Sequence, residues 1–304
     1  MFRKKLKNSI AALVLIGISS NIFLITANAQ DVQSINEPNS QIVFKDSEDV
    51  YENEETETVN EFIKLQELNK KSDSNLKSIG YSNEDIKLIR QYKDDFNNHI
   101  ISLNELSDEV LISLGYNNDQ VDTIRNFNGS EDHMIKASAT CSVSRSSGRF
   151  YYDSINKATN LIVNYSFKWS GAPVFRGTDL MAVSNGEQMY FHSSSYLNVS
   201  YAPLGSTGAT SSKKIYAKIH DSGNTGASFS FKMIGNNGLS YAKSGSGKVY
   251  LHRQNVNLSQ VGVGVKYGHS TISISPSVSF PLGGGISFSK NVQNIGPNPL
   301  ICYK

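Results

Sequence analysis

The sequence predicts a mainly β protein, with an antiparallel β-sandwich or barrel-like C-terminal domain preceded by a small α-helical repeat module. Three observations lead to this prediction. From residue 141 onward, apolar and polar residues alternate in short runs separated by Gly, Asn and Ser turns. Between residues 68 and 127, one pattern with helix-capping residues occurs twice. The charge also divides, because residues 30–140 hold 23 acidic and 10 basic side chains, whereas residues 141–304 hold 4 and 15.

Residues 1–29 are typical of a cleavable secretory signal peptide. Arg3, Lys4, Lys5 and Lys7 precede an apolar stretch, and Ala27-Asn28-Ala29 has the small residues of a cleavage site. An uncleaved membrane anchor is the alternative. We therefore expect a secreted, extracellular protein. Residues 30–60 are acidic and poor in large apolar side chains, and this composition predicts a disordered segment.

Residues 61–130 predict a helical module built from two 35-residue repeats. LNKKSDSNLKSIGYSNEDIKLIRQY begins at Leu68, and LNELSDEVLISLGYNNDQVDTIRNF begins at Leu103. In each copy a serine should cap one helix, a glycine should end it, and Ser82 or Asn117 should cap the next. The segment is too acidic to favour nucleic acid as a partner, and it is interpreted as an interaction module or a pro-region. Residues 131–140 are interpreted as a linker and a processing site.

Residues 141–304 predict a basic β-sandwich domain with a net charge of +11. Cys141 and Cys302 bracket it, and two cysteines in an exported chain favour a disulfide bond, with two buried free thiols as the alternative. The single tryptophan, Trp169, alternates with Phe167 on a predicted strand. That position favours the centre of the sandwich core over a sugar-stacking platform.

The stretch from Val261 to Lys290 predicts a β-hairpin with one apolar face and one face of Ser, Gly and Lys. Turns are expected at residues 268–270 and 283–285. Arms of this length are similar in style to the membrane-inserting hairpins of β-pore-forming toxins, although no family motif accompanies the pattern. An ordinary half-buried sheet gives the same alternation, and Pro276 favours that alternative. The residues of the candidate membrane hairpin are Val261, Val263, Val265, Tyr267, Ile272, Ile274, Val278 and Phe280.

No catalytic motif, metal-binding cluster or cofactor fingerprint is present, so we expect a protein that is not an enzyme and needs no metal or cofactor. The β half has four carboxylates, and Asp179 and Asp221 are expected to serve turns or caps. A weaker hypothesis is a secreted hydrolase such as a ribonuclease, with His220 and His252 as the acid/base pair. Surface histidines without a catalytic role are the plainer interpretation.

The leading functional hypothesis is a secreted, non-catalytic binding protein whose basic β domain attaches to an anionic lipid headgroup, cell-wall polymer or acidic glycan. The alternative is a β-pore-forming or membrane-damaging toxin that an acidic pro-region holds inactive. Both hypotheses expect the acidic N-terminal region to contact the basic β domain. The expected contacts to the anionic partner are Lys213, Lys214, Lys218, Lys232, Lys243, Lys248, Arg253 and Lys266.

Overall fold

In the computed structural model, the described residues are 52–205, 210–220, 226–235, 238–270, 276–281, 283–289 and 292–304. The predicted signal peptide, most of the predicted disordered segment and Asp221 lie outside these residues. Residues 1–41 and 42–304 form two separate units, and the account below concerns the second. The mainly β prediction with antiparallel sheets and a preceding helical part is confirmed.

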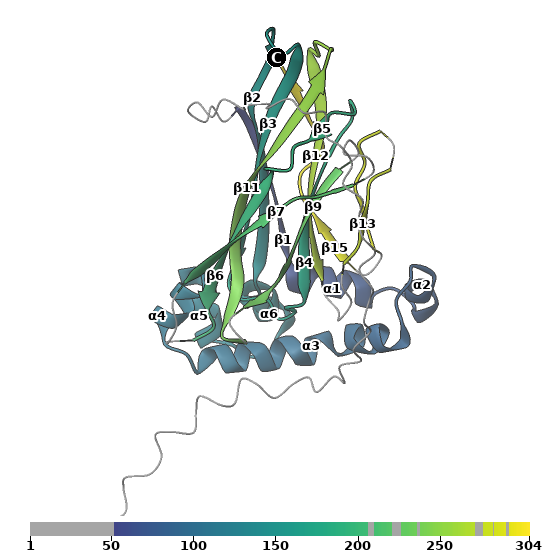
Figure 1. Cartoon of the computed structure of the whole chain (residues 1–304). Helices are drawn as coiled ribbons and strands as arrows, with labels where there is room; N and C mark the ends of the chain where they lie inside the picture. The colour runs from purple at the N-terminus through teal and green to yellow at the C-terminus, as the bar shows by residue number, and fades with distance from the viewer. Residues whose placement is uncertain are drawn as a thin grey trace, which may run out of the picture. The chain divides into compact units, whose positions relative to one another are not determined.

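Two antiparallel sheets carry most of the described residues. The first sheet has the strand order β1-β2-β3-β11-β6-β7, and β5 and β10 also pair with β11. Its strands are β1 (Glu52–Asn60), β2 (Thr140–Asp153), β3 (Ala158–Ser170), β5 (Tyr190–Phe191), β6 (Tyr196–Pro203), β7 (Ser211–Tyr216), β10 (Ile234–Gly235) and β11 (Ser240–Gln254). The long strands β2, β3 and β11 run side by side through the molecule (Figure 1).

The second sheet has the order β15-β12-β4-β9-β8, and β16 also pairs with β12. Its strands are β4 (Thr178–Asn185), β8 (Lys218–His220), β9 (Gly226–Lys232), β12 (Gln260–Ser270), β15 (Val292–Ile295) and β16 (Leu300–Tyr303). A third, two-stranded sheet joins β13 (Val278–Ser279) to β14 (Ser287–Phe288).

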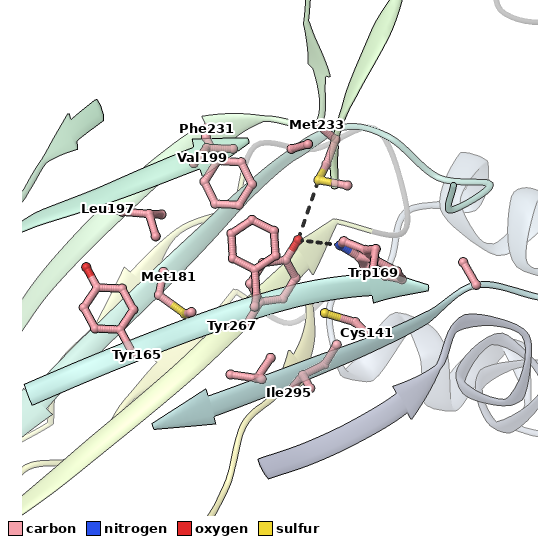
Figure 2. Close-up of a cluster of buried hydrophobic side chains, with 14 of the residues drawn as sticks. Cys141, Tyr165, Trp169, Met181, Leu197, Val199, Phe231, Met233, Tyr267 and Ile295 are labelled. Atoms are coloured by element: carbon pink, nitrogen blue, oxygen red, sulfur yellow. Dashed lines mark hydrogen bonds between the residues drawn. The ribbon is translucent and has the colours of Figure 1, made fainter. Parts of the chain in front are cut away.

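The core lies between the two large sheets. The ring of Phe167 on β3 stacks on that of Phe231 on β9, with centroids 5.1 Å apart, and lies 4.9 Å from that of Tyr267 on β12. Trp169 is fully buried and donates a hydrogen bond from Nε1 to Tyr267 Oη at 3.1 Å (Figure 2). The position predicted for Trp169 is confirmed. These aromatic contacts across the sheets fix how the two layers face each other.

The helices gather at one end of the long strands (Figure 1). They are α1 (Glu61–Asn69), α2 (Asp73–Ser78), α3 (Asn83–Asn104), α4 (Asp108–Ser113), α5 (Asn118–Arg125) and α6 (Glu131–Ala137). Most of their buried side chains share one apolar cluster with those of the sheets, whereas Leu76 of α2 packs with Ile86 and Ile89 of α3 in a separate cluster. Gln120 on α5 donates a hydrogen bond to the Ser138 carbonyl at 3.0 Å, and Lys243 on β11 donates one to the Ser113 carbonyl at 2.9 Å.

The 35-residue repeat is visible in three dimensions. Ser72 and Ser107 cap α2 and α4, and the residues that end these helices are followed by glycines with φ near 100°, Gly80 at 101° and Gly115 at 95°. The arginines at matching positions of the two copies also make equivalent hydrogen bonds. Arg90 donates to the Asn69 carbonyl and Asp73, and its equivalent Arg125 donates to the Asn104 carbonyl and Asp108. Helix α3 continues beyond the end of the first repeat copy at Tyr92. No glycine or proline occurs between residues 93 and 104, and Phe96, Ile100 and Leu103 extend the buried face of the helix.

Residues 52–60 correct the prediction of disorder for the whole of 30–60, because they form strand β1 at the edge of the first sheet. The side chains explain the strand. Thr56 and Thr58 hydrogen-bond to Ser144 and Ser142 on β2 at 2.6 and 2.8 Å. Glu55 forms an ion pair with Arg145 at 2.8 Å. Because Thr and Glu alternate, the side chains on both faces of this strand have partners on neighbouring strands. The acidic composition alone does not reveal this.

The predicted linker and processing site at residues 131–140 is also wrong in part. Residues 131–137 form helix α6, with Ser130 as its N-cap, and Met134 and Ala137 are buried in the common core. A helix packed on the core is a poor protease site, because its backbone must unwind before it can be cut. The small polar residues that suggested a linker are the exposed side of an amphipathic helix.

The predicted disulfide is absent, since Cys141 and Cys302 are both free and buried. Cys141 lies on β2 opposite Trp169, and Cys302 lies on β16 opposite Val261. Burial raises the pKa of the Cys141 thiol well above its ordinary value and that of Cys302 to about 12. Both thiols therefore stay protonated and unreactive, and they act as small core side chains.

The predicted hairpin over residues 261–290 needs a correction as well. Residues 268–270, expected as a turn, continue strand β12, which pairs with β4, β15 and β16. The segment after it forms its own hairpin, β13–β14, whose turn contains Gly283 and Gly284 at positive φ, as predicted for residues 283–285. We call residues 276–289 the cap hairpin. Its apolar side chains pack on Leu180 and Ala182, on the outer face of the second sheet.

Candidate functional site

The strand registers define a continuous polar array on the outer face of the first sheet. Ser144 on β2 stands beside Ser166, which is followed across the sheet by Ser246, Asn198 and Lys214. Parallel rows lie on either side of this one. We call this surface the polar face, formed by Ser142, Ser144, Ser146, Asn164, Ser166, Lys168, Tyr196, Asn198, Ser200, Ser212, Lys214, Tyr216, Ser244, Ser246 and Lys248.

Period-2 alternation in single strands creates this face. On β11, Ser244, Ser246 and Lys248 point outward, whereas Gly245 and Gly247 lie between them on the core side. The glycines are required there, because a Cβ at Gly245 would lie 2.4 Å from the Phe167 ring and one at Gly247 would lie 2.2 Å from the Tyr196 carbonyl oxygen. The aromatic rings of β3 therefore fill the core under β11 and leave its hydroxyls outside.

A pocket of about 380 Å³ opens on the polar face. Serines, tyrosines, an asparagine and charged residues from β1, β2, β3, β6 and β11 line it. The lining residues are Glu54, Ser144, Arg145, Ser146, Asn164, Tyr165, Ser166, Tyr196, Ser246, Gly247 and Lys248. Asn164 is 8% exposed, and its Nδ2 has no hydrogen-bond partner within the described part of the chain. A buried amide donor without an acceptor is uncommon and marks this position for a ligand test.

Lys214 and two tyrosines form the neighbouring part of the polar face. The Lys214 ammonium lies 4.0 Å from the ring centroid of Tyr196 and 5.5 Å from that of Tyr216. Cation–π attraction of this kind holds a lysine in place while its charge stays available to solvent. Tyr216 is 61% exposed, so an aromatic surface lies beside the pocket.

The eight cations predicted to contact an anionic partner do not form one patch. Lys214 and Lys248 lie on the polar face, and Lys213 is exposed on the edge strand β7. Lys218 and Lys232 are exposed on β8 and β9 of the other sheet. Lys168, which the sequence reasoning missed, lies exposed on the polar face opposite Ser244.

Three of the eight predicted cations have internal roles. Lys243 donates to the Ser113 carbonyl of the helical part, Arg253 donates to the Glu187 carbonyl at 2.6 Å, and Lys266 donates to the Gly296 carbonyl. Burial lowers the pKa of Lys243 and of Lys266 below the ordinary lysine value. Counting lysines in the sequence therefore overstates the charge that faces solvent.

The inward residues of the candidate membrane hairpin are core residues. Val261, Val263, Val265 and Tyr267 are fully buried between the sheets. Ile272 and Ile274 lie outside the described residues. Val278 and Phe280 belong to the cap hairpin, and Phe280 is 6% exposed. The two predicted arms thus belong to different sheets.

Glu61, Asp179 and His269 form a buried ionic cluster that the sequence reasoning missed. Their side chains are fully buried, although they come from α1, β4 and β12. His269 Nδ1 lies 2.8 Å from Asp179 Oδ2, and its Nε2 lies 3.5 Å from Glu61 Oε1. The sequence reasoning expected Asp179 in a turn or cap, and that expectation is wrong.

Further hydrogen bonds complete the cluster. Asp179 accepts from Tyr267 Oη at 2.5 Å and from the Ser270 backbone at 2.9 Å, and Glu61 accepts from the Val174 and Phe175 backbone N–H groups at 2.9 Å each. Burial alone would lower the pKa of His269, but the charge and hydrogen bond of Asp179, followed by those of Glu61, raise it to about 10. The imidazolium is therefore a structural cation that ties α1 to the second sheet.

The suggested acid/base pair of His220 and His252 is not assembled. His220 lies on β8, where its Nε2 is 2.8 Å from Ser228 Oγ and its ring is 5.0 Å from that of Phe280. His252 lies on β11 of the other sheet, near the rings of Tyr190 and His192. Burial lowers the pKa of His252 to about 4. The two histidines therefore lie on different sheets and have different neighbours.

Within the described residues, no group of three His, Cys, Asp or Glu side chains is arranged to hold a metal ion. None of the described helices is long and apolar enough to span a membrane.

Comparison with known proteins gives little further information. No family model matches the chain, and no curated protein matches it. One solved structure, described as "Pore forming protein", is similar over 54% of this chain and 85% of its own, with 10% identity and a TM-score of 0.26. Another is described as "Complete structure of manganese lipoxygenase of Gaeumannomyces graminis and partial structure of zonadhesin of Komagataella pastoris". It covers 55% of this chain and 63% of its own, with 7% identity and a TM-score of 0.23. Likenesses at these TM-scores carry no argument about function.

Proposed function

We propose that this chain is a secreted, non-catalytic attachment protein whose polar face binds an anionic surface or polymer. The observation that carries the proposal is the composition of that face. Three lysines, Lys168, Lys214 and Lys248, stand among serines, asparagines and tyrosines on a continuous outer sheet surface. Such a surface attracts anions over distances of about one Debye length, roughly 8–10 Å at physiological salt.

The carboxylates of the β half support the same proposal, because the described ones have roles inside the fold. Asp179 is buried in the ionic cluster. Glu187 Oε2 accepts from the Gly262 backbone at 2.9 Å. Asp153 accepts from the Ile155 backbone in a turn, also at 2.9 Å. The lysines of the polar face therefore meet few carboxylates from this half of the chain, and Glu54 on β1 is the carboxylate that lines the pocket.

A sedimentation assay tests the proposal. The full chain is mixed with vesicles containing phosphatidylglycerol, and separately with an insoluble anionic polysaccharide, at low and high salt. We expect binding at low salt that falls steeply as salt rises, because released counterions drive it. The double variant Lys214→Gln with Lys248→Gln should bind more weakly than the matched pair Lys218→Gln with Lys232→Gln, which removes the same charge from the second sheet. Absence of salt-dependent binding to both materials contradicts the proposal.

A second candidate is membrane damage through the cap hairpin, and one observation favours it. The cap hairpin is a separate two-stranded sheet that contacts the second sheet mainly through the side chains of Val278, Phe280, Ile286 and Phe288. Such packing can open without breaking a long backbone ladder. Dye release from phosphatidylglycerol liposomes, faster for Phe280→Ser than for the natural chain, would support it. No release at micromolar protein would exclude it.

A further inference from the structure

We infer that the pocket on the polar face binds one acidic sugar unit of an anionic glycan, while Lys168 and Lys214 contact neighbouring units of the same chain. This inference rests on the proposed function and names its ligand and its central site. The argument begins with Asn164. Its side chain is more than nine-tenths buried, it lines the pocket, and its Nδ2 has no acceptor within the described residues. Nδ2 itself is shielded from solvent, so a turn of the amide toward the pocket would let a ligand oxygen satisfy a donor that is otherwise costly to bury.

The other lining groups fit a sugar. Ser144, Ser146, Ser166 and Ser246 supply hydroxyls that can both donate and accept, as the hydroxyls of a sugar also do. Tyr196 supplies the edge of an aromatic ring, and its main-chain carbonyl is already satisfied by Tyr165 Oη at 2.9 Å. The lining carries few aliphatic side chains, so a lipid tail or an apolar ligand would leave these groups without partners.

The charge of the pocket selects an acidic sugar unit. The Lys248 side chain lines the pocket from β11, where a carboxylate on the sugar would be stabilised by its ammonium. Arg145 also contributes to the lining. Its Nη2 donates to Glu55 and to the Asn298 carbonyl, whereas its Nε and Nη1 have no partner within the described residues, so its charge adds to that of Lys248. Glu54 lies at the β1 side, and it would disfavour a second anionic group at that edge.

The spacing of the lysines indicates a polymer rather than a single small anion. Lys168 lies on the strand next to that of Lys248 and is offset from it by four residues along the strand. Lys214 lies two strands from Lys248 and is offset by two residues. Strand geometry therefore places their Cα atoms roughly 14 and 12 Å apart, respectively. Because side chains stand roughly perpendicular to a sheet, charges repeated along a glycan chain match these separations better than one phosphate or carboxylate does.

The same face is poorly suited to a bilayer. Large exposed apolar residues elsewhere include Ile155, Leu239 and Tyr303, but on the polar face Tyr216 is the only described one. A surface that enters the headgroup region normally presents several such side chains together. The polar face instead presents many small hydroxyl side chains around the pocket, which matches a hydroxylated polymer that lies along it.

The test measures binding of a hexasaccharide in which uronate and N-acetylhexosamine alternate, by titration calorimetry on the full chain at low salt. We expect Asn164→Asp to weaken binding about tenfold or more, because a carboxylate replaces the donor and repels the ligand, and Lys248→Gln to weaken it about fivefold to tenfold. The matched control Lys232→Gln, on the second sheet, should change the affinity less than about twofold. The hexasaccharide with its carboxyls reduced to alcohols should bind at least about tenfold more weakly.

The outcomes separate this inference from the proposed function. If Asn164→Asp binds the hexasaccharide as well as the natural chain, the pocket is not the site. If Lys232→Gln weakens binding as much as Lys248→Gln, attachment is spread over the surface, so the proposed function stands and the site does not. If phosphatidylglycerol vesicles bind and the hexasaccharide does not, the ligand class is wrong. If nothing anionic binds, both fail. Thermal unfolding of each variant, expected to match the natural chain, shows that the fold is intact.

Discussion

Strands β11 and β12 both alternate glycine with a second residue, yet their glycines face opposite ways. In β11, Gly245 and Gly247 point into the core and the residues between them point to solvent. In β12, Val263 and Val265 point into the core, and Gly264 lies on the outer face, where a Cβ would be 3.5 Å from Ile286 of the cap hairpin. The glycines of β11 make room for aromatic rings of the neighbouring strand. Gly264 and Gly268 of β12 make room for Ile286 and Phe288 of the cap hairpin, whereas no atom lies within 4 Å of the Cβ position at Gly262.

The difference shows that glycines alternating along a strand indicate where other atoms approach its backbone closely. They do not indicate which side of the strand is exposed to solvent. The first sheet keeps its outer face open, so that face carries Ser, Asn and Lys. The second sheet has its outer face partly covered, so Leu180 and Ala182 of β4 can lie there beside the glycines of β12. The polar side of β11 is therefore a surface, whereas the glycine side of β12 is an interface within the molecule.

Removing the cover from the second sheet should have the largest effect. Phe280 is 6% exposed, and its ring lies against Gly226, where a Cβ would be 2.1 Å away. Phe280→Ala should lower the free energy of unfolding by about 3–5 kcal/mol, because it removes a buried ring and leaves a cavity. Urea unfolding followed by tryptophan fluorescence measures this. A loss below about 1 kcal/mol would mean that the cap hairpin does not pack as described.

The core-facing residues of β12 end with the charged His269. The pH dependence of stability therefore tests the packing at that end of the strand. Its folded pKa of about 10 exceeds the ordinary value of 6.5. The stabilisation is therefore fully present below about pH 6.5, declines as the pH rises, and is lost above about pH 10, with a slope of up to about 1.4 kcal/mol per pH unit. We expect the urea midpoint to fall between pH 7 and 9, below the range of ordinary tyrosine ionisation.

The variant Glu61→Gln provides the control for this prediction. It keeps the shape of the side chain and removes one of the two carboxylates that raise the pKa of His269. The variant should be less stable at pH 7, and its stability should depend less on pH between 7 and 9. An equal slope in the variant and the natural chain would show that Glu61 does not hold the imidazolium.

Glycine-to-alanine substitutions test the comparison of the two strands directly. Gly247→Ala should destabilise the protein by about 1–3 kcal/mol, because the new methyl group meets the Tyr196 carbonyl and the Tyr165 ring. Gly262→Ala on β12 is the matched control. No atom lies within 4 Å of its Cβ position, so the change should stay within about 0.5 kcal/mol. Equal effects of the two substitutions would remove the distinction between the strands.

The open face should show the smallest effect. Ser246 is exposed in the middle of the polar face. Ser246→Ala should change the free energy of unfolding by less than about 0.5 kcal/mol, as is usual for surface positions. A larger loss in thermal or urea unfolding would indicate that this face is covered in the folded chain.

Local signals in the sequence predicted local structure well. The caps at Ser72 and Ser107 and the glycines that follow their helices depend on neighbours a few residues away, so the repeat could be located without a structure. The mainly β character of residues 141–304 follows from alternation in the same way. The helix over 131–137 was missed because its apolar side, Met134 and Ala137, is short and gains its stability from packing on other elements.

Signals that depend on distant partners were not available from the sequence. Two cysteines in an exported chain suggest a disulfide, but strand pairing places Cys141 and Cys302 as separate core residues. The sequence predicted only part of the polar face. Lys248 and Lys266 look alike in the sequence, but Lys248 lines a pocket whereas Lys266 donates a hydrogen bond to a carbonyl. Which side of a strand becomes a surface depends on what the rest of the chain places over it.

Glu61 and His269 are 208 residues apart in the chain, yet each needs the other's charge. During synthesis Glu61 is made early, and the histidine that neutralises it is added 208 residues later. A chain that stops before residue 269 would leave two carboxylates facing an apolar interior with nothing to neutralise them. Such a fragment should stay loosely folded, so the pairing makes completion of the polypeptide a condition for a stable fold.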